Sequence, residues 1–272
     1  MWIVRRQQRN CTKNFGRRNC DKRVSPFVTK NKIVKKGQDL ILYFLCERRR
    51  EMEECKVCNL YNLSQTIASD LLESVTYPWE ALNRIKDYIL KVGNQLDTEK
   101  YDKIGEDVWI AKTAKVMPSA YIHGPAIIGE NAEIRHCAFI RGKVLVGNDA
   151  VIGNSTELKN VILFNKVQVP HYNYVGDSIL GYQAHMGAGS ITSNVKSDKK
   201  LIVVKNGTEQ IQTSLKKFGA MIGDKVEIGC NSVLNPGTVI GKNSNVYPLS
   251  SIRGVLPPNS IYKNQNEIVQ KI

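Results

Sequence analysis

The sequence predicts an all-β chain wound as a parallel β-helix and preceded by a short two-helix segment. Aliphatic residues recur every six positions from 104 to 158, and the same register returns from 222 to 252. A small residue stands four positions after most of these aliphatic residues. Helical apolar spacing is confined to residues 63–93. A strict six-residue period is typical of a β-helix, in which each hexad supplies a short strand and a turn.

Residues 1–51 form a basic N-terminal extension. They carry fifteen Lys and Arg against four acidic residues, whereas residues 52–272 hold 24 bases and 21 acids. One interpretation is an arm that binds nucleic acid or an acidic membrane surface. We favour a second, in which Met52 is the true initiator, because Arg48-Arg49-Arg50 is what a translated ribosome-binding sequence would give. We therefore expect neither nucleic acid nor membrane as a partner.

Composition indicates a cytoplasmic protein. Hydrophobic residues make up 42% of the chain, and its longest apolar run, Leu40–Cys46, is far shorter than the roughly 20 residues that span a bilayer. No secretory signal follows Met1, and the seven scattered cysteines favour a reducing compartment. Cys55 and Cys58 have the spacing of half a zinc site, but no second pair follows, so we expect free thiols.

Residues 52–103 form the predicted helical segment. The first helix has an apolar face made of Ile67, Leu71, Leu72 and Val75, with Ser64 available as its cap. The second helix opens at Pro78, ends at Gly93, and has a face made of Trp79, Leu82, Ile85, Ile89 and Val92. These faces are too small for an independent domain. We expect them to pack on the first coil of the β-helix or on a subunit contact.

The β-helix is predicted over residues 104–262, followed by a tail at 263–272. The residues expected to point into it are Ile104, Ile110, Val116, Ile122, Ile128, Ile134, Ile140, Val146, Ile152 and Leu158, then Ile222, Ile228, Leu234, Ile240, Val246 and Ile252. Three hexads close one triangular coil. The register slips between Leu158 and Met186 and again between Asn194 and Ile222. Because a regular prism needs no exceptions for stability, we look for function at these breaks.

The breaks contain a specific pattern of polar residues. Its elements are Glu157-x-Lys159, then His171, Tyr174, Gly176-Asp177, Gly187-Ala188-Gly189-Ser190-Ile191-Thr192 and Asn194. This pattern resembles the acetyltransferase domain of the bifunctional enzyme that acetylates glucosamine-1-phosphate and then uridylylates it. The insertion at 201–220 is more similar to archaeal-type sugar-phosphate nucleotidyltransferases. The hexapeptide-repeat family to which these domains belong has a left-handed β-helix, and its members usually form trimers.

The resemblance implies roles for individual residues. Catalytic roles fall on His171, Tyr174 and Asn194, and substrate-binding roles on Arg141, Glu157, Lys159, His185 and Lys200. Positions that contact acetyl-CoA, a co-substrate, fall on Ala188, Cys230, Pro248 and Lys263. The implied acceptor is an amino-sugar phosphate, the expected assembly is a homotrimer, and acetyl transfer requires no metal.

The residue chemistry agrees with these roles. His171 suits the base that takes a proton from an amine near neutral pH. The backbone of Gly187–Gly189 or the hydroxyl of Tyr174 would stabilise an oxyanion. Arg141, Lys159 and Lys200 supply cations for a sugar phosphate.

Two positions depart from the family pattern. His185 stands where the family has an Asn that contacts substrate, so the choice of acceptor is expected to differ. The distal Arg that binds coenzyme A falls near Gln265, with Lys263 as the nearest substitute.

Residues 1–103 also contain no glycine-rich nucleotide loop, so we expect the acetyltransferase half without a nucleotidyltransferase domain.

Two alternatives remain open. A γ-type carbonic anhydrase has the same predicted fold, but His123, His136, His171 and His185 lack its close histidine pair. A non-catalytic sensor or scaffold would bind sugar phosphate through Arg141, Lys159 and Lys200 without turnover.

Overall fold

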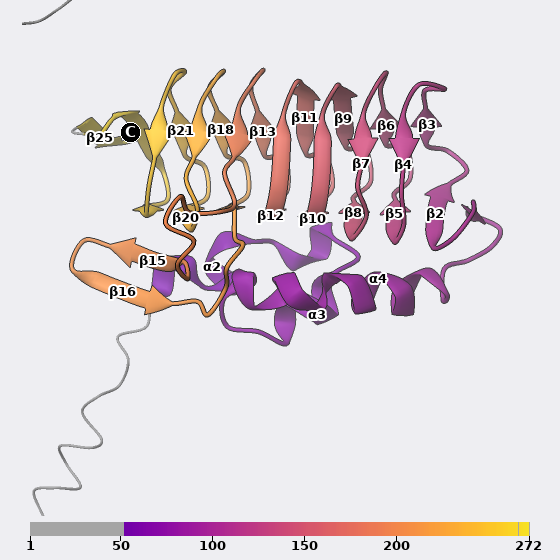
Figure 1. The fold of residues 1–272 in the computed structure, drawn as a ribbon, viewed down its shortest axis with the longest axis horizontal. Coiled ribbons are helices and arrows are strands. Elements are labelled where there is room, and N and C mark those ends of the chain that lie inside the picture. The colour runs from indigo at the N-terminus through magenta and orange to yellow at the C-terminus, as the bar shows by residue number, and fades with distance from the viewer. Residues whose placement is uncertain (1–51, 266, 272) are drawn as a thin grey trace, which may run out of the picture. The chain divides into compact units, whose positions relative to one another are not determined.

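The computed structural model describes residues 52–265 and 267–271, which belong to one compact unit. The hypothesis about residues 1–51 lies outside the described residues. Parallel strands stack coil upon coil as the expected left-handed β-helix, with short helices along one side (Figure 1). Among the described residues no helix has the length and hydropathy needed to cross a bilayer.

Each coil contributes a strand to each of three faces. The helix-covered face contains β2 (Val108–Ala111), β5 (Ala126–Ile128), β8 (Val144–Val146), the second halves of β10 (Glu157–Leu163) and β12 (Tyr174–Leu180), β17 (Ala220–Ile222), β20 (Thr238–Ile240) and β23 (Val255–Leu256). The open face contains β4 (Tyr121–Ile122), β7 (Phe139–Ile140), the first halves of β10 and β12, β14 (Ile191–Thr192), β19 (Val233–Leu234) and β22 (Ser251–Ile252). The third face contains β3 (Lys115–Val116), β6 (Glu133–Ile134), β9 (Val151–Asn154), β11 (Gln168–His171), β13 (His185–Met186), β18 (Glu227–Ile228), β21 (Asn245–Val246) and β24 (Ser260–Asn264).

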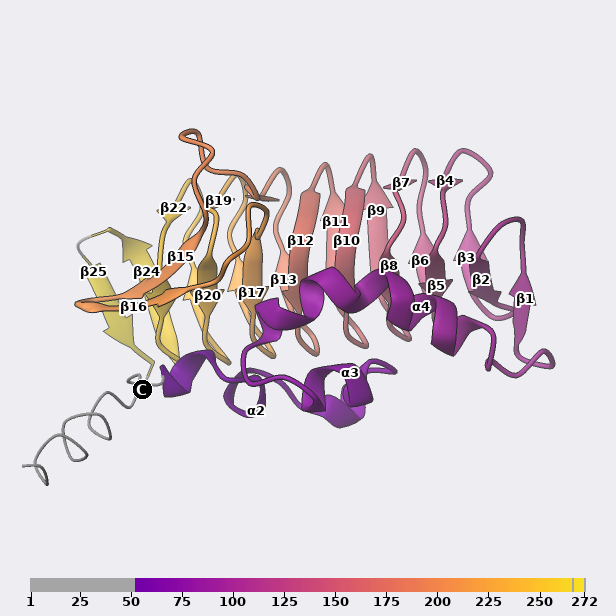
Figure 2. The ribbon, with the colours of Figure 1, turned by 60° about the horizontal axis from the view of Figure 1, so that its bottom comes forward.

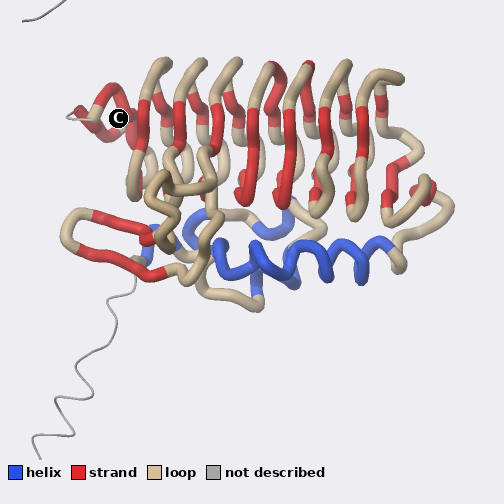
Figure 3. Tube along the Cα trace, in the orientation of Figure 1, coloured by secondary structure: helices blue, strands red, loops and turns tan. Residues whose placement is uncertain are grey.

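Antiparallel strands occur at the two ends of the prism and in the insertion. β1 (Tyr101–Lys103) pairs with β2, and β25 (Glu267–Gln270) pairs with β24. The insertion is a hairpin of β15 (Val203–Asn206) and β16 (Glu209–Gln212), which projects beside the coils (Figure 3).

The corners need residues with a left-handed backbone. Among the described residues, eighteen that are not glycine have φ between 47° and 60°, and Asn and Asp, which tolerate this conformation best, occupy many of these sites. Two corners concern the site. We call the one between the third and open faces the His171 corner, and the one between the open and helix-covered faces the Asp177 corner.

The register breaks are changes in coil length. In the regular coils partners lie 18 residues apart, as Ala126 and Val144 do. In the first irregular stretch Glu157 pairs with Tyr174, so each coil there is one residue shorter. The second break is the insertion, across which Ile191 pairs with Val233. The prism therefore continues through both breaks, and only the corners and their outward side chains change.

The first coil differs from the hexad prediction. Ile104 is 55% exposed and Val116 is 36% exposed, whereas the later aliphatic positions from Ile128 to Leu158 are buried. Within residues 52–265 no preceding coil covers these first residues, so Ile104 does not point into a closed prism. They line an open cavity of about 460 Å³ at this end.

The helical segment is more broken than predicted. It contains the 3-10 turns η1 (Glu53–Cys55), η2 (Leu63–Gln65) and η3 (Pro78–Arg84) and the helices α2 (Val57–Leu60), α3 (Ser69–Glu73) and α4 (Ile85–Gly93). Pro78 and Gly93 delimit the second helical stretch as expected. The prediction for the first was wrong in two respects: Ser64 lies within η2, so α3 follows Ala68 without a side-chain cap, and Ile67 is 38% exposed. Leu71 and Leu72 are buried as expected.

Of the two positions predicted for the helical segment, the first coil is wrong, and packing on a subunit contact stays a prediction. The segment lies along the helix-covered face across many coils, not on the first coil alone (Figure 2). α4 packs against β5, β8 and β10, and the Tyr61 hydroxyl donates to the carbonyl of Ile179, 3.3 Å away. Outward residues of this face, such as Ile127, Leu145 and Ile162, are therefore fully buried.

Candidate active site

A polar cluster crosses the open face and ends at the Asp177 corner. Register places Glu157 beside Tyr174 and Lys159 beside Gly176. A Cβ on Gly176 would lie 2.5 Å from the Tyr174 hydroxyl and 2.9 Å from Nδ2 of Asn194. Glycine is therefore required there, because its missing side chain leaves the space in which these two polar groups meet.

Asp177 is the centre of this cluster. Its carboxylate is buried and accepts hydrogen bonds from Lys159 Nζ at 3.2 Å, Asn160 Nδ2 at 2.9 Å and Asn194 Nδ2 at 2.5 Å. Asn194 Nδ2 also donates to the Tyr174 hydroxyl at 3.1 Å. The sequence pattern contained Asp177, but nothing in its spacing showed that a buried carboxylate organises the cluster.

The Tyr174 hydroxyl is set up as a donor. It accepts from Asn194, so its own hydrogen is available to a ligand. Burial, and next the negative charge of Asp177, raise the pKa of Tyr174. The phenol therefore stays protonated at neutral pH.

Arg141 and Glu157 form a separate ion pair on the same face. Arg141 Nη1 lies 2.5 Å from Glu157 Oε1, and this hydrogen bond raises the pKa of the guanidinium. Arg141 and Lys159 thus each hold a carboxylate, so two of the three cations expected to bind phosphate are already paired.

The His171 corner forms the other edge of the open face. His171 is exposed, and its carbonyl accepts from the Gly189 amide at 3.0 Å. The same backbone bond repeats up the corner, from Asn231 to Ala188 and from Leu249 to Cys230. One column of the corner therefore contains His171, Ala188, Cys230 and the neighbouring Pro248. The last three were expected to contact acetyl-CoA.

Buried Asn173 holds this corner, and sequence reasoning missed it. Its Oδ1 accepts from the His171 amide at 3.1 Å, and its Nδ2 donates to the carbonyls of Gly187 at 2.9 Å and Ser190 at 3.1 Å. An asparagine two residues past a loop histidine is too weak a signal to find in sequence. Its role depends on two coils being neighbours in space.

The Gly187–Gly189 backbone supplies one amide for a ligand. The Gly187 amide donates to the carbonyl of Ile228, and the Gly189 amide donates to the carbonyl of His171. In the described part of the chain, the Ala188 amide has no acceptor.

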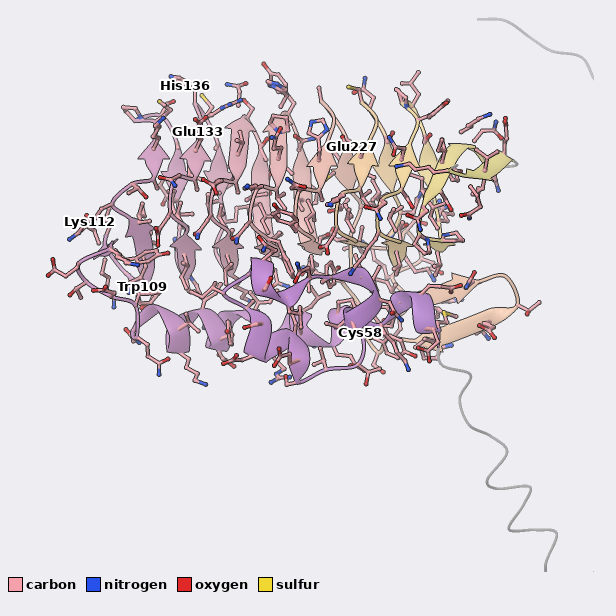
Figure 4. All side chains as sticks on the ribbon, turned by 180° about the vertical axis from the view of Figure 1, so that it is seen from behind. Cys58, Trp109, Lys112, Glu133, His136 and Glu227 are labelled. Atoms are coloured by element: carbon pink, nitrogen blue, oxygen red, sulfur yellow. The ribbon has the colours of Figure 1, made fainter. Side chains whose placement is uncertain are left out.

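The remaining predicted residues form no hydrogen bond or ion pair with the polar cluster among the described residues. His185 is on the third face, where its Nδ1 lies 2.8 Å from Glu227 Oε2, beside a cavity of about 590 Å³. Lys200 is exposed in the loop after β14, and Lys263 pairs with Glu267 at 2.6 Å. Figure 4 shows Glu227 on the strands, with His136 at the edge opposite the helices.

Metal ligands do not gather in the structure. No group of three or more His, Cys, Asp or Glu side chains suited to a metal occurs among the described residues. Cys55 is buried and Cys58 is exposed, and both are free.

The coils and their hexads define the class of fold: the chain is a left-handed β-helix built from hexapeptide repeats. The family model described as the GMPPB C-terminal domain matches residues 122–207. The chain is 30% identical over 200 residues to the bifunctional protein GlmU of Methanococcus maripaludis, covering 72% of this chain and 48% of that protein.

A second relative is the bifunctional sugar-1-phosphate nucleotidylyltransferase/acetyltransferase of Sulfurisphaera tokodaii. It is 31% identical over 174 residues, covering 63% of this chain and 43% of that protein. The chain thus spans about half the length of these curated relatives. Among solved structures, a perosamine N-acetyltransferase from Caulobacter crescentus aligns with 15% identity and a TM-score of 0.29 over 68% of this chain and 65% of that one. That similarity is too low to inform function.

Proposed function

We propose that this chain transfers an acetyl group from acetyl-CoA to the amine of an amino-sugar phosphate. The observation that carries the proposal is the adjacency of the His171 column to the Tyr174–Asn194–Asp177 cluster along one face. The names of the relatives, which include a sugar-1-phosphate nucleotidylyltransferase/acetyltransferase, support it.

His171 would act as the general base. The amine attacks the thioester carbonyl, a C–N bond forms, and His171 takes the proton that the nitrogen loses. Collapse of the tetrahedral intermediate breaks the C–S bond, and the proton passes to the departing thiolate. The exposed imidazole has no side-chain hydrogen bond within the described residues, so it is accessible to an acceptor.

Two donors suit the oxyanion of the intermediate. The Ala188 amide points from the same corner as His171, and the Tyr174 hydroxyl has a hydrogen to donate. Asn194 gives both amide hydrogens to Tyr174 and Asp177, which leaves its carbonyl oxygen to accept from a sugar hydroxyl.

A homotrimer would complete the site. Tyr172 and Leu249, which occupy left-handed positions of the His171 corner, are 66% and 80% exposed. Large apolar side chains at such exposure suit a subunit contact. His185 lies on the third face, away from the cluster in one chain, and a neighbouring subunit at this corner would bring its own copy to the site.

The alternative is sugar-phosphate binding without turnover. The two functions differ in a single measurable event, the release of coenzyme A thiol.

The test is thiol release from acetyl-CoA with glucosamine-1-phosphate and other amino-sugar phosphates. His171→Ala should lower turnover by about 100-fold or more while leaving acceptor binding intact. His136→Ala, on the same corner, is the matched control and should not change the rate. Unchanged turnover in His171→Ala would refute the role of the base, and no thiol release with any acceptor would favour binding without turnover.

A further inference from the structure

A cavity of about 370 Å³ lies at the Asp177 corner, where three segments meet. η3 contributes Leu82 and Asn83, and the corner contributes Lys143, Lys159, Asn160 and Asp177. The segment that follows the hairpin contributes Ser214, Leu215, Lys216 and Lys217. None of the roles proposed above uses Lys143, Lys216 or Lys217.

Positive charge dominates this cavity. Four lysines line it against one carboxylate, Asp177, which is already paired with Lys159. Lys143, Lys216 and Lys217 are exposed, and none forms an ion pair with another described residue. Ammonium groups converging in a concave site repel one another and create a field that attracts anions.

The lysine pair is held on a fixed frame. Phe218, the next residue, is fully buried and stacks on Trp79 with ring centroids 5.6 Å apart. The Phe218 amide donates to the Asn194 carbonyl at 3.0 Å, and the Gly219 amide donates to the Asp177 carbonyl at 2.8 Å. The chain immediately after Lys216 and Lys217 is therefore anchored to the backbone of Asn194 and Asp177, and both lysines line the same cavity as Asp177.

We propose that this cavity is a binding site for a phosphate-class anion, formed where the insertion closes against the prism. Lysine ammonium groups bind phosphate as point charges, and the exposed amide of Asn83 adds a neutral donor. Lys159 lines the cavity and bonds Asp177, so an anion there contacts the polar cluster directly. The site does not depend on acetyl transfer and binds its ligand without acetyl-CoA.

Calorimetric titration in the absence of acetyl-CoA tests the site. The probes are inorganic phosphate, glucose 1-phosphate, which has a phosphate ester but no amine, and uncharged glucose. Lys216→Gln/Lys217→Gln should weaken phosphate binding about 10-fold or more, because two cations are lost. Lys86→Gln/Lys91→Gln removes the same charge from the exposed side of α4 and should bind like the parent.

Each outcome decides the proposal. Tighter binding of glucose 1-phosphate than of inorganic phosphate identifies an ester ligand, and equal binding identifies the free ion. Glucose that binds as well as its phosphate overturns the proposal. Phosphate binding that survives in Lys216→Gln/Lys217→Gln but is lost in Arg141→Gln also overturns it, by placing the anion at the transfer site. His171→Ala should bind phosphate normally, so a failed acetyl transfer reaction leaves this result intact.

Discussion

The helix-covered face and the open face share one backbone repeat and differ in the side chain that points outward from each strand. On the helix-covered face this residue is apolar in nearly every coil: Trp109, Ile127, Leu145, Ile162, Ile179, Met221 and Val239. On the open face the corresponding residues are Tyr121, Phe139, Glu157, Tyr174, Ile191, Val233 and Ser251. One position per hexad thus decides which face is packed and which can bind ligand.

The difference separates stability from chemistry. Burying each large outward aliphatic side chain contributes roughly 1.5–3 kcal/mol, so the row beneath α4 holds the helices firmly. On the open face no described helix covers the outward row, where Phe139 is 40% exposed, and the buried polar contacts lie at its edges, around Asp177 and Asn173. Substitutions on the two faces should therefore fail in different ways.

The largest effect should come from a charge beneath the helices. Ile162→Asp places an unpaired carboxylate at a position that is 1% exposed, and should lower the free energy of unfolding by about 4 kcal/mol or more. Urea denaturation measures it. Phe139→Asp, on the open face at 40% exposure, is the control and should cost about 1 kcal/mol or less. Equal losses would mean that the two faces are not distinct.

Removing the carboxylate of the polar cluster should have the next largest effect. Asp177→Asn leaves Lys159 without its partner and removes charge-assisted bonds from two amides, at a cost of about 2–3 kcal/mol. Chemical denaturation again provides the measurement. Asp198→Asn removes an exposed ion pair with Lys196 and should be indistinguishable from the parent. If Asp177→Asn were as stable as that control, the carboxylate would not organise the cluster.

A smaller loss is expected at the His171 corner. Asn173→Ala leaves the carbonyls of Gly187 and Ser190 without their donor, and should cost about 1–3 kcal/mol. It should also lower turnover more than it weakens acceptor binding, because the His171 backbone loses its anchor. Asn59→Ala, which removes one exposed bond to the Glu53 carbonyl, provides the baseline. A stability loss without any change in turnover would show that Asn173 supports the fold alone.

The smallest effect on stability is expected from labelling the thiols, which compares buried Cys55 with the exposed cysteines. Burial, with a smaller effect from Glu54, raises the pKa of the Cys55 thiol from 9.0 to about 12. Iodoacetamide at pH 8 should therefore modify exposed Cys58, Cys137 and Cys230 before Cys55, as peptide mass analysis would show. Rapid labelling of Cys55 in the folded protein would contradict its burial.

The same thiol gives a pH dependence with a definite sign. Because the pKa of Cys55 is higher in the folded than in the unfolded chain, its contribution to stability is complete below pH 9 and is lost as the pH rises toward 12. Cys55→Ser should flatten this part of the stability curve. An unchanged curve would exclude the thiol as its cause.

The amino-acid sequence determined the coils of this protein, because a six-residue period leaves the backbone few other ways to bury Ile128, Ile134 and Ile140 together. It also predicted most polar residues of the candidate site, since they stand where the period slips, although it did not predict Asn173. It did not show that the slip is a coil shortened by one residue, nor that Ile104 is left exposed at an uncovered end.

Tertiary structure alone decided which side chains meet. Asp177 contacts Lys159 and Asn194 because residues 17 or 18 apart become neighbours when coils stack, and Lys217 reaches that corner only through the fold of the insertion. The helices likewise follow the helix-covered face because the outward side chains of its strands, such as Ile127 and Leu145, are apolar and become buried beneath them. The apolar spacing of the helices themselves did not predict this path. Local periodicity fixes a strand and its turn, whereas contacts between coils depend on coil length, corner geometry and insertions, which no single hexad encodes.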